Sequence, residues 1–351
     1  MRRIFALVLS TALTLVTLSG CGQKQPQREL NLYTWDGLFP QEVLYGFTEE
    51  TGIQINYSSF DSNEAMLAKL ESTEGGQYDL VVADDYIIEA AIQEGLVLPL
   101  DKKQIPNFSN INPLFQGQYF DPQDQYTVPY GAGIQAIVYS PERVGFEIKS
   151  FDDLLDPRLK DRIGLVNVAR FIYGASLLED GESVNAEDPE VIRKAAQQVL
   201  DMAPNIRMIK DMGLQDDLIS GEIDVAVTFT GEVTQACKAD PSLKIVYSQK
   251  GLGFGVQGQF IPVNAPHAAE AHAFMDYILR PEISKQCFEE IGYYSTNKAA
   301  DALIDDSMKP FLTLPEGVEI GQMDMMRNIP AESLDLHLQL WTEFRNACGA
   351  N

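Results

Sequence analysis

The chain has 351 residues, of which 45% are hydrophobic and 22% are charged, as in packed globular proteins and unlike disordered ones. This length allows one large or two medium domains. The formal net charge of -25 argues against nucleic acid as a partner, because that partner requires a basic surface.

The first residues are typical of an export signal. Arg2 and Arg3 precede an apolar run over 4–18. That run is shorter than the ~20 residues that a membrane-spanning helix requires, and it ends like a cleaved signal. The sequence Leu-Ser-Gly-Cys at 18–21 resembles the lipobox of bacterial lipoproteins.

The lipobox resemblance implies a signal peptide at 1–20 that is cleaved before Cys21. It also implies that Cys21 is lipidated and anchors the protein to a membrane. A plain signal peptide with an incidental cysteine is the alternative. Residues 21–29 are polar and lack periodicity, as expected of a tether.

The stretch 30–60 predicts a strand, a helix and a second strand. Apolar residues alternate in both strands and recur at helical spacing over 43–47. A right-handed βαβ unit of this kind requires a parallel sheet. Trp35 and Asp36 fall at the carboxyl end of the first strand, where ligands bind in open α/β sheets. An aromatic ring followed by an acid could bind a cation, whereas a tryptophan that covers the sheet edge is the alternative.

A second carboxyl end follows a continuous apolar strand at 78–83. The residues there are Asp84, Asp85 and Tyr86. Either acid could face a ligand, or it could cap the helix that starts at Ile87. The remaining periodic segments are helices at 63–72, 87–94, 190–202, 268–279 and 332–347 and strands at 163–168 and 223–230.

Two extended segments that contain glycine, 126–139 and 253–263, separate two α/β blocks. Glycines interrupt a strand that bends as it leaves one sheet for another. Two such crossings predict two lobes with a hinged cleft between them. We expect lobe one at 30–131 plus 260–300 and lobe two at 132–259 plus 301–351.

Catalytic, cofactor and metal motifs are not found. His267 and His272 are five residues apart, unlike the i, i+4 pair of a zinc helix. The glycines over 251–255 lack the third glycine of a dinucleotide fingerprint. We therefore expect no enzyme, no cofactor and no metal. An odd number of cysteines remains after Cys21, so either one disulfide and one free thiol or no disulfide is expected from Cys237, Cys287 and Cys348.

Several short runs together resemble the spermidine/putrescine-binding proteins of bacterial ABC importers. These runs are Tyr33–Trp35, Glu49–Ile53, Ser62–Leu70, Tyr78–Val82, Asn107–Asn110, Leu279–Glu282 and Ile291–Asn297. The resemblance covers nearly the whole mature chain in order. It implies an α/β, two-lobed periplasmic-binding-protein-like fold of type II, in which each lobe is a mostly parallel sheet with helices on both faces and two segments cross the hinge.

In that family, aromatic rings sandwich the methylene chain of the solute and carboxylates bind its ammonium ends. Both attractions strengthen as a closing cleft excludes water. By resemblance, the ring positions match Trp35, Tyr86 and Tyr293. Asp36, Asp84 and Asp85 stand where the family often has Thr or Ser, and they could supply the acid of lobe one.

Lobe two departs from the family pattern. The family's acidic pair beside an arginine is absent, and Arg170 remains. A family tryptophan is replaced by Phe229, and a later tryptophan and aspartate by Gly255 and Gln257. A rough match places Arg327 where the family has glutamine. These changes remove negative charge from one wall of the cleft.

Three functions are therefore weighed. With Asp36, Asp84, Asp85 and Glu232 in the cleft, the protein is a lipid-anchored, extracytoplasmic monomer that binds a polyamine by hinge closure and delivers it to an ABC permease. With Arg170 and Arg327 there, a small anion or zwitterion becomes the solute, because arginine matches carboxylate groups. A salt bridge within lobe two is the other interpretation of Arg170. A surface hydrolase or adhesin lipoprotein is the distant alternative.

Overall fold

A computed structural model describes residues 28–247, 252–312 and 323–349. The expected signal peptide, Cys21 and all but the end of the expected tether lie outside the described residues. Among the described helices, none is long and apolar enough to cross a membrane.

Lobe one is built on three parallel strands, with β1 between β2 and β3. The end of α1 and the start of α2 are each explained by one residue. Gly52, at φ 70°, takes the left-handed conformation that ends α1, and the Ser62 side chain caps α2 by accepting from the amide of Ala65 at 3.1 Å. The elements are β1 Glu29–Thr34, α1 Gln41–Thr51, β2 Gln54–Ser59, α2 Asn63–Ser72, β3 Leu80–Asp84, α3 Asp85–Gln93, α9 Ala268–Ile278 and α10 Pro281–Ile291.

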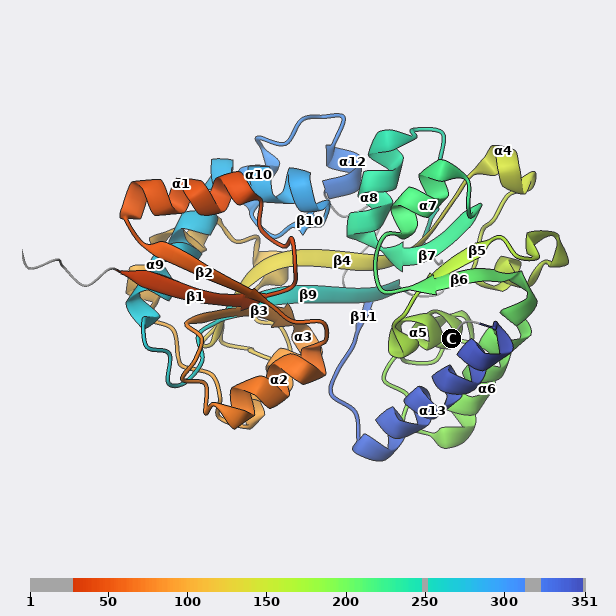
Figure 1. Ribbon diagram of the computed structural model, residues 1–351, viewed down its shortest axis with the longest axis horizontal. Coiled ribbons are helices and arrows are strands. Elements are labelled where there is room, and N and C mark those ends of the chain that lie inside the picture. The colour runs from red at the N-terminus through yellow and green to blue at the C-terminus, as the bar shows by residue number, and fades with distance from the viewer. Residues whose placement is uncertain (1–27, 248–251, 313–322, 350–351) are drawn as a thin grey trace, which may run out of the picture.

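Lobe two repeats this design, with β5 parallel to both β6 and β7. Its elements are α4 Pro141–Val144, β5 Ile163–Val166, α5 Ala169–Glu179, α6 Pro189–Asp201, β6 Ile206–Lys210, α7 Leu214–Ser220, β7 Val225–Phe229, α8 Thr230–Ala239, β8 Lys244–Val246 and α13 Ala331–Ala347. In Figure 1, α1, α8 and α10 lie above the sheet and α2, α5 and α13 lie below it, so that helices cover both faces. The expected fold class is confirmed.

Two long antiparallel strands, β4 (Thr127–Tyr139) and β9 (Leu252–Phe260), join the lobes. β9 also pairs with β3 of lobe one, and β4 pairs with β7 of lobe two. One sheet therefore runs through the molecule in the order β2-β1-β3-β9-β4-β7-β5-β6. The expected lobe limits at 131/132 and 259/260 fall inside these two strands and stay a prediction.

Shorter elements complete the chain. Three of them are 3-10 turns that lie within residues 102–115, between α3 and β4. The short elements are η1 Lys102–Gln104, η2 Pro106–Asn110, η3 Pro113–Phe115, η4 Asp152–Leu155, η5 Pro157–Leu159, η6 Ala203–Asn205, β10 Tyr294–Ser295, α11 Lys298–Asp301, α12 Lys309–Leu312 and β11 Met323–Met325.

A third connection follows β11. Residues 324–328, which we call the strap, comprise the end of β11 and the first part of the segment that leads to α13 (Figure 1). On the side of lobe one, the Tyr119 hydroxyl donates to the Met326 carbonyl at 2.5 Å. On the side of lobe two, the Asn185 amide donates to the Met325 carbonyl at 2.7 Å. The strap is thus bonded to both lobes, in addition to the two expected crossings.

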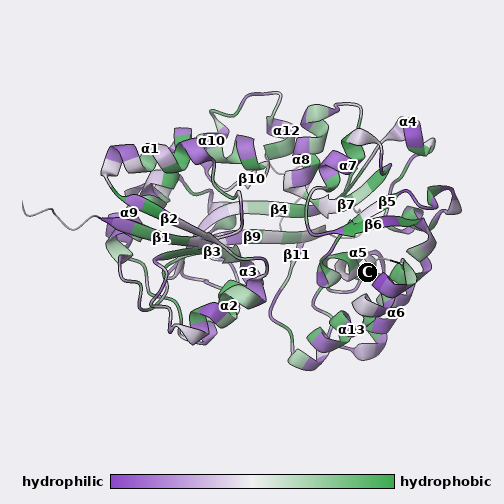
Figure 2. Cartoon of the chain, in the orientation of Figure 1, coloured by the Kyte–Doolittle hydropathy of each residue, from purple (hydrophilic) through white to green (hydrophobic). Residues whose placement is uncertain are grey.

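Each lobe has its own hydrophobic core. Trp341 and Phe344 of α13 pack into the core of lobe two, whereas Phe47 and Phe274 pack into that of lobe one. In Figure 2 the outer helices carry both hydrophilic and hydrophobic residues, as helices with one buried face do. The three described cysteines are free, with Cys237 in one core and Cys287 in the other, so the alternative without a disulfide holds among the described residues.

Candidate functional site

Asp84 lies at the carboxyl end of β3 and takes the N-cap position of α3. Its carboxylate does not cap that helix. Oδ2 accepts from Asn63 Nδ2 at 2.7 Å, and Oδ1 accepts from Gln257 Nε2 on β9 at 3.1 Å. The capping interpretation is therefore wrong for Asp84, because its side chain turns to α2 and to the crossing strand.

Asp85 is the first residue of α3, and its side chain is almost fully buried. Oδ1 accepts from the amide of Tyr86 at 2.8 Å, and Oδ2 accepts from the amide of Val256 on β9 at 3.1 Å. This carboxylate bonds to the next residue and to β9, and α3 receives no side-chain cap from its N-cap residue. Both acids of the pair therefore reach towards the strand that enters lobe two.

The pair lies in an environment that opposes its charge. Burial raises the pKa of Asp84, although the hydrogen bonds from Asn63 and Gln257 act in the opposite direction. Burial, with the neighbouring Asp84 as the second cause, raises the pKa of Asp85 to about 8. The four hydrogen bonds described for the two carboxylates all come from neutral donors. Two adjacent acids that lack a directly bonded cation are poised to receive one.

Tyr86 joins the acidic pair to α2. Its hydroxyl accepts from Asn63 Nδ2 at 3.1 Å and donates to Glu64 Oε1 at 3.1 Å. Burial raises the pKa of this hydroxyl well above its usual value. Asn63 is buried at the start of an ordinary amphipathic helix and bonds to both Tyr86 and Asp84, a role that no sequence pattern indicates.

Arg170 brings positive charge from lobe two to the same place. Its Cζ lies 5.8 Å from the centre of the Tyr86 ring. Nη1 donates to the carbonyl of Arg327 at 2.9 Å, and Nη2 donates to Asn185 Oδ1 at 3.0 Å. These acceptors are neutral, so the expected lobe-two salt bridge is wrong for the described residues. The guanidinium of Arg327 itself is exposed on the strap, with Cζ 4.7 Å from the centre of the Tyr119 ring.

Tyr293 lies where the lobes meet. A Cβ atom added to Gly131 of β4 would lie 3.4 Å from Tyr293 Cβ, and one added to Gly133 would lie 3.6 Å from Cδ1. The glycines of this strand therefore make room for the Tyr293 ring. The sequence pattern explains these glycines only by a bend of the strand. Burial, with smaller effects of Asp84 and Glu232, raises the pKa of Tyr293. Asp84 belongs to lobe one and Glu232 to lobe two.

Trp35 and Asp36 have different environments in the structure. Trp35 follows β1, is partly buried and packs on the cores of lobe one, with its ring 4.6 Å from that of Phe60. Its indole Nε1 is buried and has no hydrogen-bond partner among the described residues. Asp36 is exposed at the surface.

The other two candidates in lobe two have local partners. Phe229 packs on Phe171, with ring centres 4.4 Å apart. Glu232 Oε1 accepts from the amide of Gly213 at 2.6 Å, and Oε2 accepts from the hydroxyl of Thr228 at 2.5 Å. Glu232 thus ties the start of α7 to α8. The candidates that contacts or charge effects connect across the lobes are Asp84, Asp85, Tyr86, Gln257, Tyr293, Arg170, Arg327 and Glu232, the last through its effect on the pKa of Tyr293.

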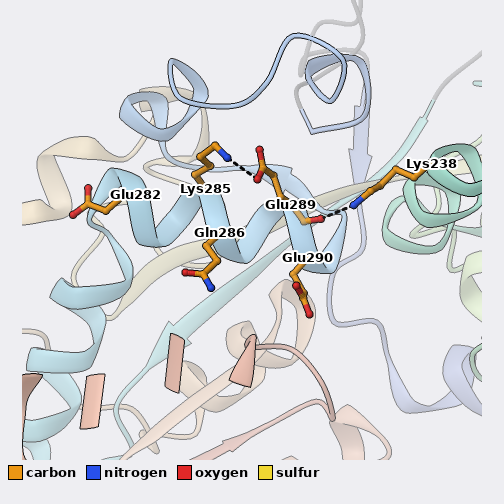
Figure 3. Close-up of a pocket in the computed structure, with 6 residues that line it drawn as sticks. All are labelled: Lys238, Glu282, Lys285, Gln286, Glu289 and Glu290. Atoms are coloured by element: carbon orange, nitrogen blue, oxygen red, sulfur yellow. Dashed lines mark hydrogen bonds and ion pairs between the residues drawn. The ribbon is translucent and has the colours of Figure 1, made fainter. Parts of the chain in front are cut away.

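A separate hollow of about 350 Å³ lies at the surface between α8 and α10 (Figure 3). Lys238 Nζ of α8 donates to the Glu289 carbonyl of α10 at 3.1 Å, and Lys285 pairs with the Glu289 carboxylate at 2.7 Å. None of the candidate residues lines this hollow. Its lining is Lys238, Glu282, Lys285, Gln286, Glu289 and Glu290.

Comparison with known proteins agrees with this architecture. Residues 44–311 match the family model of bacterial extracellular solute-binding proteins. The chain is 31% identical over 306 residues to the spermidine/putrescine-binding periplasmic protein of Escherichia coli, covering 87% of this chain and 88% of that protein. It is 26% identical over 356 residues to spermidine/putrescine-binding periplasmic protein 1 of Haemophilus influenzae, covering 98% and 99%.

A solved structure supports the same assignment. The spermidine/putrescine ABC transporter substrate-binding protein PotD from Streptococcus pneumoniae superimposes with a TM-score of 0.80 at 30% identity, covering 92% of this chain and 99% of that one. Such proteins are solute-binding components of transporters that act outside the cytoplasm, and they are not enzymes. The chain therefore belongs to the family of bacterial extracellular solute-binding proteins.

Proposed function

We propose that this protein is the extracytoplasmic solute-binding subunit of an ABC importer and that it captures a linear amine of the spermidine or putrescine type by closing its two lobes. The relatives that bind these amines support the proposal. The cluster around Asp84 and Asp85 at the junction of the lobes supports it independently.

The single observation that carries the proposal is the buried acidic pair. An ionised carboxylate taken out of water is costly unless a cation pairs with it. The hydrogen-bond partners described for Asp84 and Asp85 are neutral. A ligand ammonium group would supply the missing positive charge, whereas an anionic solute would add further negative charge beside the pair. This contrast favours an amine over a purely anionic solute.

Aromatic rings complete the proposed binding surface. Tyr86 adjoins the acidic pair in sequence, and Asp84 acts on the pKa of Tyr293. Trp35 borders both core clusters of lobe one. The face of an aromatic ring attracts a cation and covers methylene groups, and the attraction grows when closure excludes water. We assign the contact with the carbon chain of the amine to Trp35, Tyr86 and Tyr293.

The proposed setting follows from the sequence. A lipid on Cys21 would hold the monomer at the outer face of a membrane, and the tether at 21–29 would let it reach the permease. Metabolic labelling with a palmitate analogue tests the anchor. Label should appear on the wild-type protein and not on Cys21→Ser, and label on both proteins would contradict lipidation of Cys21.

Titration calorimetry with putrescine and spermidine tests the function. Binding of an ammonium group should ionise Asp85, whose pKa is about 8 in the free protein, so amine binding at pH 7 should release up to about one proton. Titrations in buffers of different ionisation enthalpy measure that release. We expect Asp84→Asn to weaken binding by about a hundredfold, because a charged hydrogen bond to the ligand is lost.

The exposed Glu190→Gln on α6 is the matched control, since it removes one negative charge far from the acidic pair. It should leave the affinity for both amines unchanged. No heat with either amine would remove the proposed ligand class and leave the fold and the family intact.

A further inference from the structure

Arg170 of lobe two places a fixed positive charge near the acidic pair of lobe one. Its guanidinium lies over the ring of Tyr86, with Cζ 5.8 Å from the ring centre, and it is largely buried. Burial and Asp84 raise the pKa of Asp85, and Arg170 opposes that rise. The charges on Arg170 and Asp85 are thus close enough to act on one another, although they come from different lobes.

Two hydrogen bonds fix the position of the Arg170 guanidinium. Nη1 donates to the Arg327 carbonyl of the strap, and Nη2 donates to Asn185 Oδ1. Asn185 is itself fixed, because its Oδ1 also accepts from the Arg327 amide at 2.7 Å and its Nδ2 donates to the Met325 carbonyl at 2.7 Å. Arg170 cannot swing out of the cleft without breaking two charge-assisted hydrogen bonds.

The two ends of a linear solute would therefore meet different charges. An ammonium group at Asp84 and Asp85 gains a counter-charge. A second ammonium group that points towards lobe two meets Arg170, and like charges about 6 Å apart in a partly desolvated site weaken binding by about tenfold to a hundredfold. The acid of lobe two that could offset this, Glu232, is bonded to Gly213 and Thr228.

One atom of Arg170 calls for an acceptor. Its Nε is buried and has no hydrogen-bond partner among the described residues. A buried donor that stays unpaired costs free energy, and an arginine N–H can only donate. A second ammonium group also donates only, so it cannot satisfy this atom. A carboxylate or amide oxygen at the far end of the solute can.

We infer that the site selects linear amines with an ammonium group at one end only and an oxygen acceptor at the other, and that Arg170 is the residue that determines this specificity. The inference rests on the proposed function, because the amine end is still bound by the acidic pair of lobe one. It moves the preferred substrate class from diamines and polyamines to ω-amino acids and N-acylated diamines, which keep the one ammonium end that the acidic pair binds.

Four probes of the same carbon chain test it by calorimetry on the full mature protein. They are putrescine, butylamine, 4-aminobutanoate and N-acetylputrescine. For the wild-type protein we expect the two oxygen-bearing probes to bind at least about tenfold more tightly than putrescine. Butylamine should bind less tightly than the oxygen-bearing probes, because it leaves the Nε donor unpaired.

Substitutions at Arg170 assign the effect. Arg170→Gln removes the charge, so putrescine should gain affinity and 4-aminobutanoate should lose it. Arg170→Lys keeps the charge and should keep the discrimination against putrescine. Arg207→Gln, an exposed lobe-two arginine on β6 that pairs with Asp161 and Glu222, is the control and should leave the order of the four probes unchanged.

The outcomes separate the two proposals. If no probe binds and spermidine also gives no heat, the proposed function fails. If putrescine binds the wild-type protein as tightly as the oxygen-bearing probes, the inference is overturned and the proposed function stands. The comparison of probes on the wild-type protein decides this even if Arg170→Gln does not fold.

Discussion

The two lobes share one design and bring different charged groups to their junction. In lobe one, Asp84 and Asp85 follow β3 and are bonded by neutral donors. In lobe two, Glu232 follows β7 at the corresponding carboxyl end but is bonded within its own lobe, and Arg170 supplies the charge. At the same strand-to-helix junction, the two carboxylates of lobe one therefore reach towards β9, whereas the carboxylate of lobe two stabilises its own lobe.

The lobes also differ in the pH range that weakens them. Burial raises the pKa of Asp85 in lobe one to about 8. In lobe two, burial, with a smaller effect of Arg170, lowers the pKa of His337 to about 4, and neither ring nitrogen of this fully buried histidine has a partner among the described residues. The chain has two tryptophans, Trp35 in lobe one and Trp341 in lobe two, so fluorescence can follow each lobe separately.

The largest effect should come from Asp85→Asn. Between the unfolded pKa of about 4 and the folded pKa of about 8, the folded protein holds a proton that the unfolded chain lacks, so stability falls as pH rises through this range. The decrease should be several kcal/mol, and about 5 kcal/mol at most. Urea unfolding of a Trp341→Phe background, followed by Trp35 fluorescence from pH 4 to 8, measures it. Asp85→Asn should flatten the slope, and an equal slope in both proteins would refute the buried charge.

His337→Leu should act in the opposite direction on lobe two. Between pH 4 and 6.5 the unfolded chain binds a proton that the folded protein does not, so stability is lost as pH falls through this range. The expected loss is about 3 kcal/mol. Unfolding of a Trp35→Phe background, followed by Trp341 fluorescence, should show this loss in the parent and not in His337→Leu. A loss that persists in His337→Leu would point to another group.

Trp35→Ala should weaken amine binding by about tenfold or slightly more, because a desolvated cation–π contact contributes about 1–2 kcal/mol. Trp35→Phe keeps a ring at this position and should recover part of the affinity. Calorimetry with 4-aminobutanoate and putrescine measures both variants. Unchanged affinity for both ligands in Trp35→Ala would remove this ring from the binding surface.

The smallest effect is expected for Glu232→Gln. The amide would lose one of the two hydrogen bonds that the carboxylate accepts, which should destabilise lobe two by about 1 kcal/mol. Amine affinity should stay within about twofold of the wild type. A loss of tenfold or more would place Glu232 in the binding site and erase the contrast between the lobes.

Sequence periodicity was sufficient to predict much of the fold and to place Asp84 and Asp85 at the carboxyl end of a strand. The continuous apolar run was enough to predict the strand that ends at Asp84, next to Asp85, and a role of either acid in ligand binding stays a prediction. α5 was missed because all of Ala169–Glu179 is buried, which removes the polar face that marks a helix in a sequence. The strap and Asn185 could not be predicted, since their contacts join residues more than a hundred positions apart.

The glycines beside Tyr293 bear on how the lobes move. Gly131 and Gly133 of β4 lie against this ring, and a side chain on either would crowd it. Glycine leaves the backbone beside the ring without a side chain at these two positions. We expect the Tyr293 ring to slide along this backbone when one lobe rotates relative to the other and the continuous sheet twists. Bulky residues at positions 131 and 133 should therefore hinder the rotation.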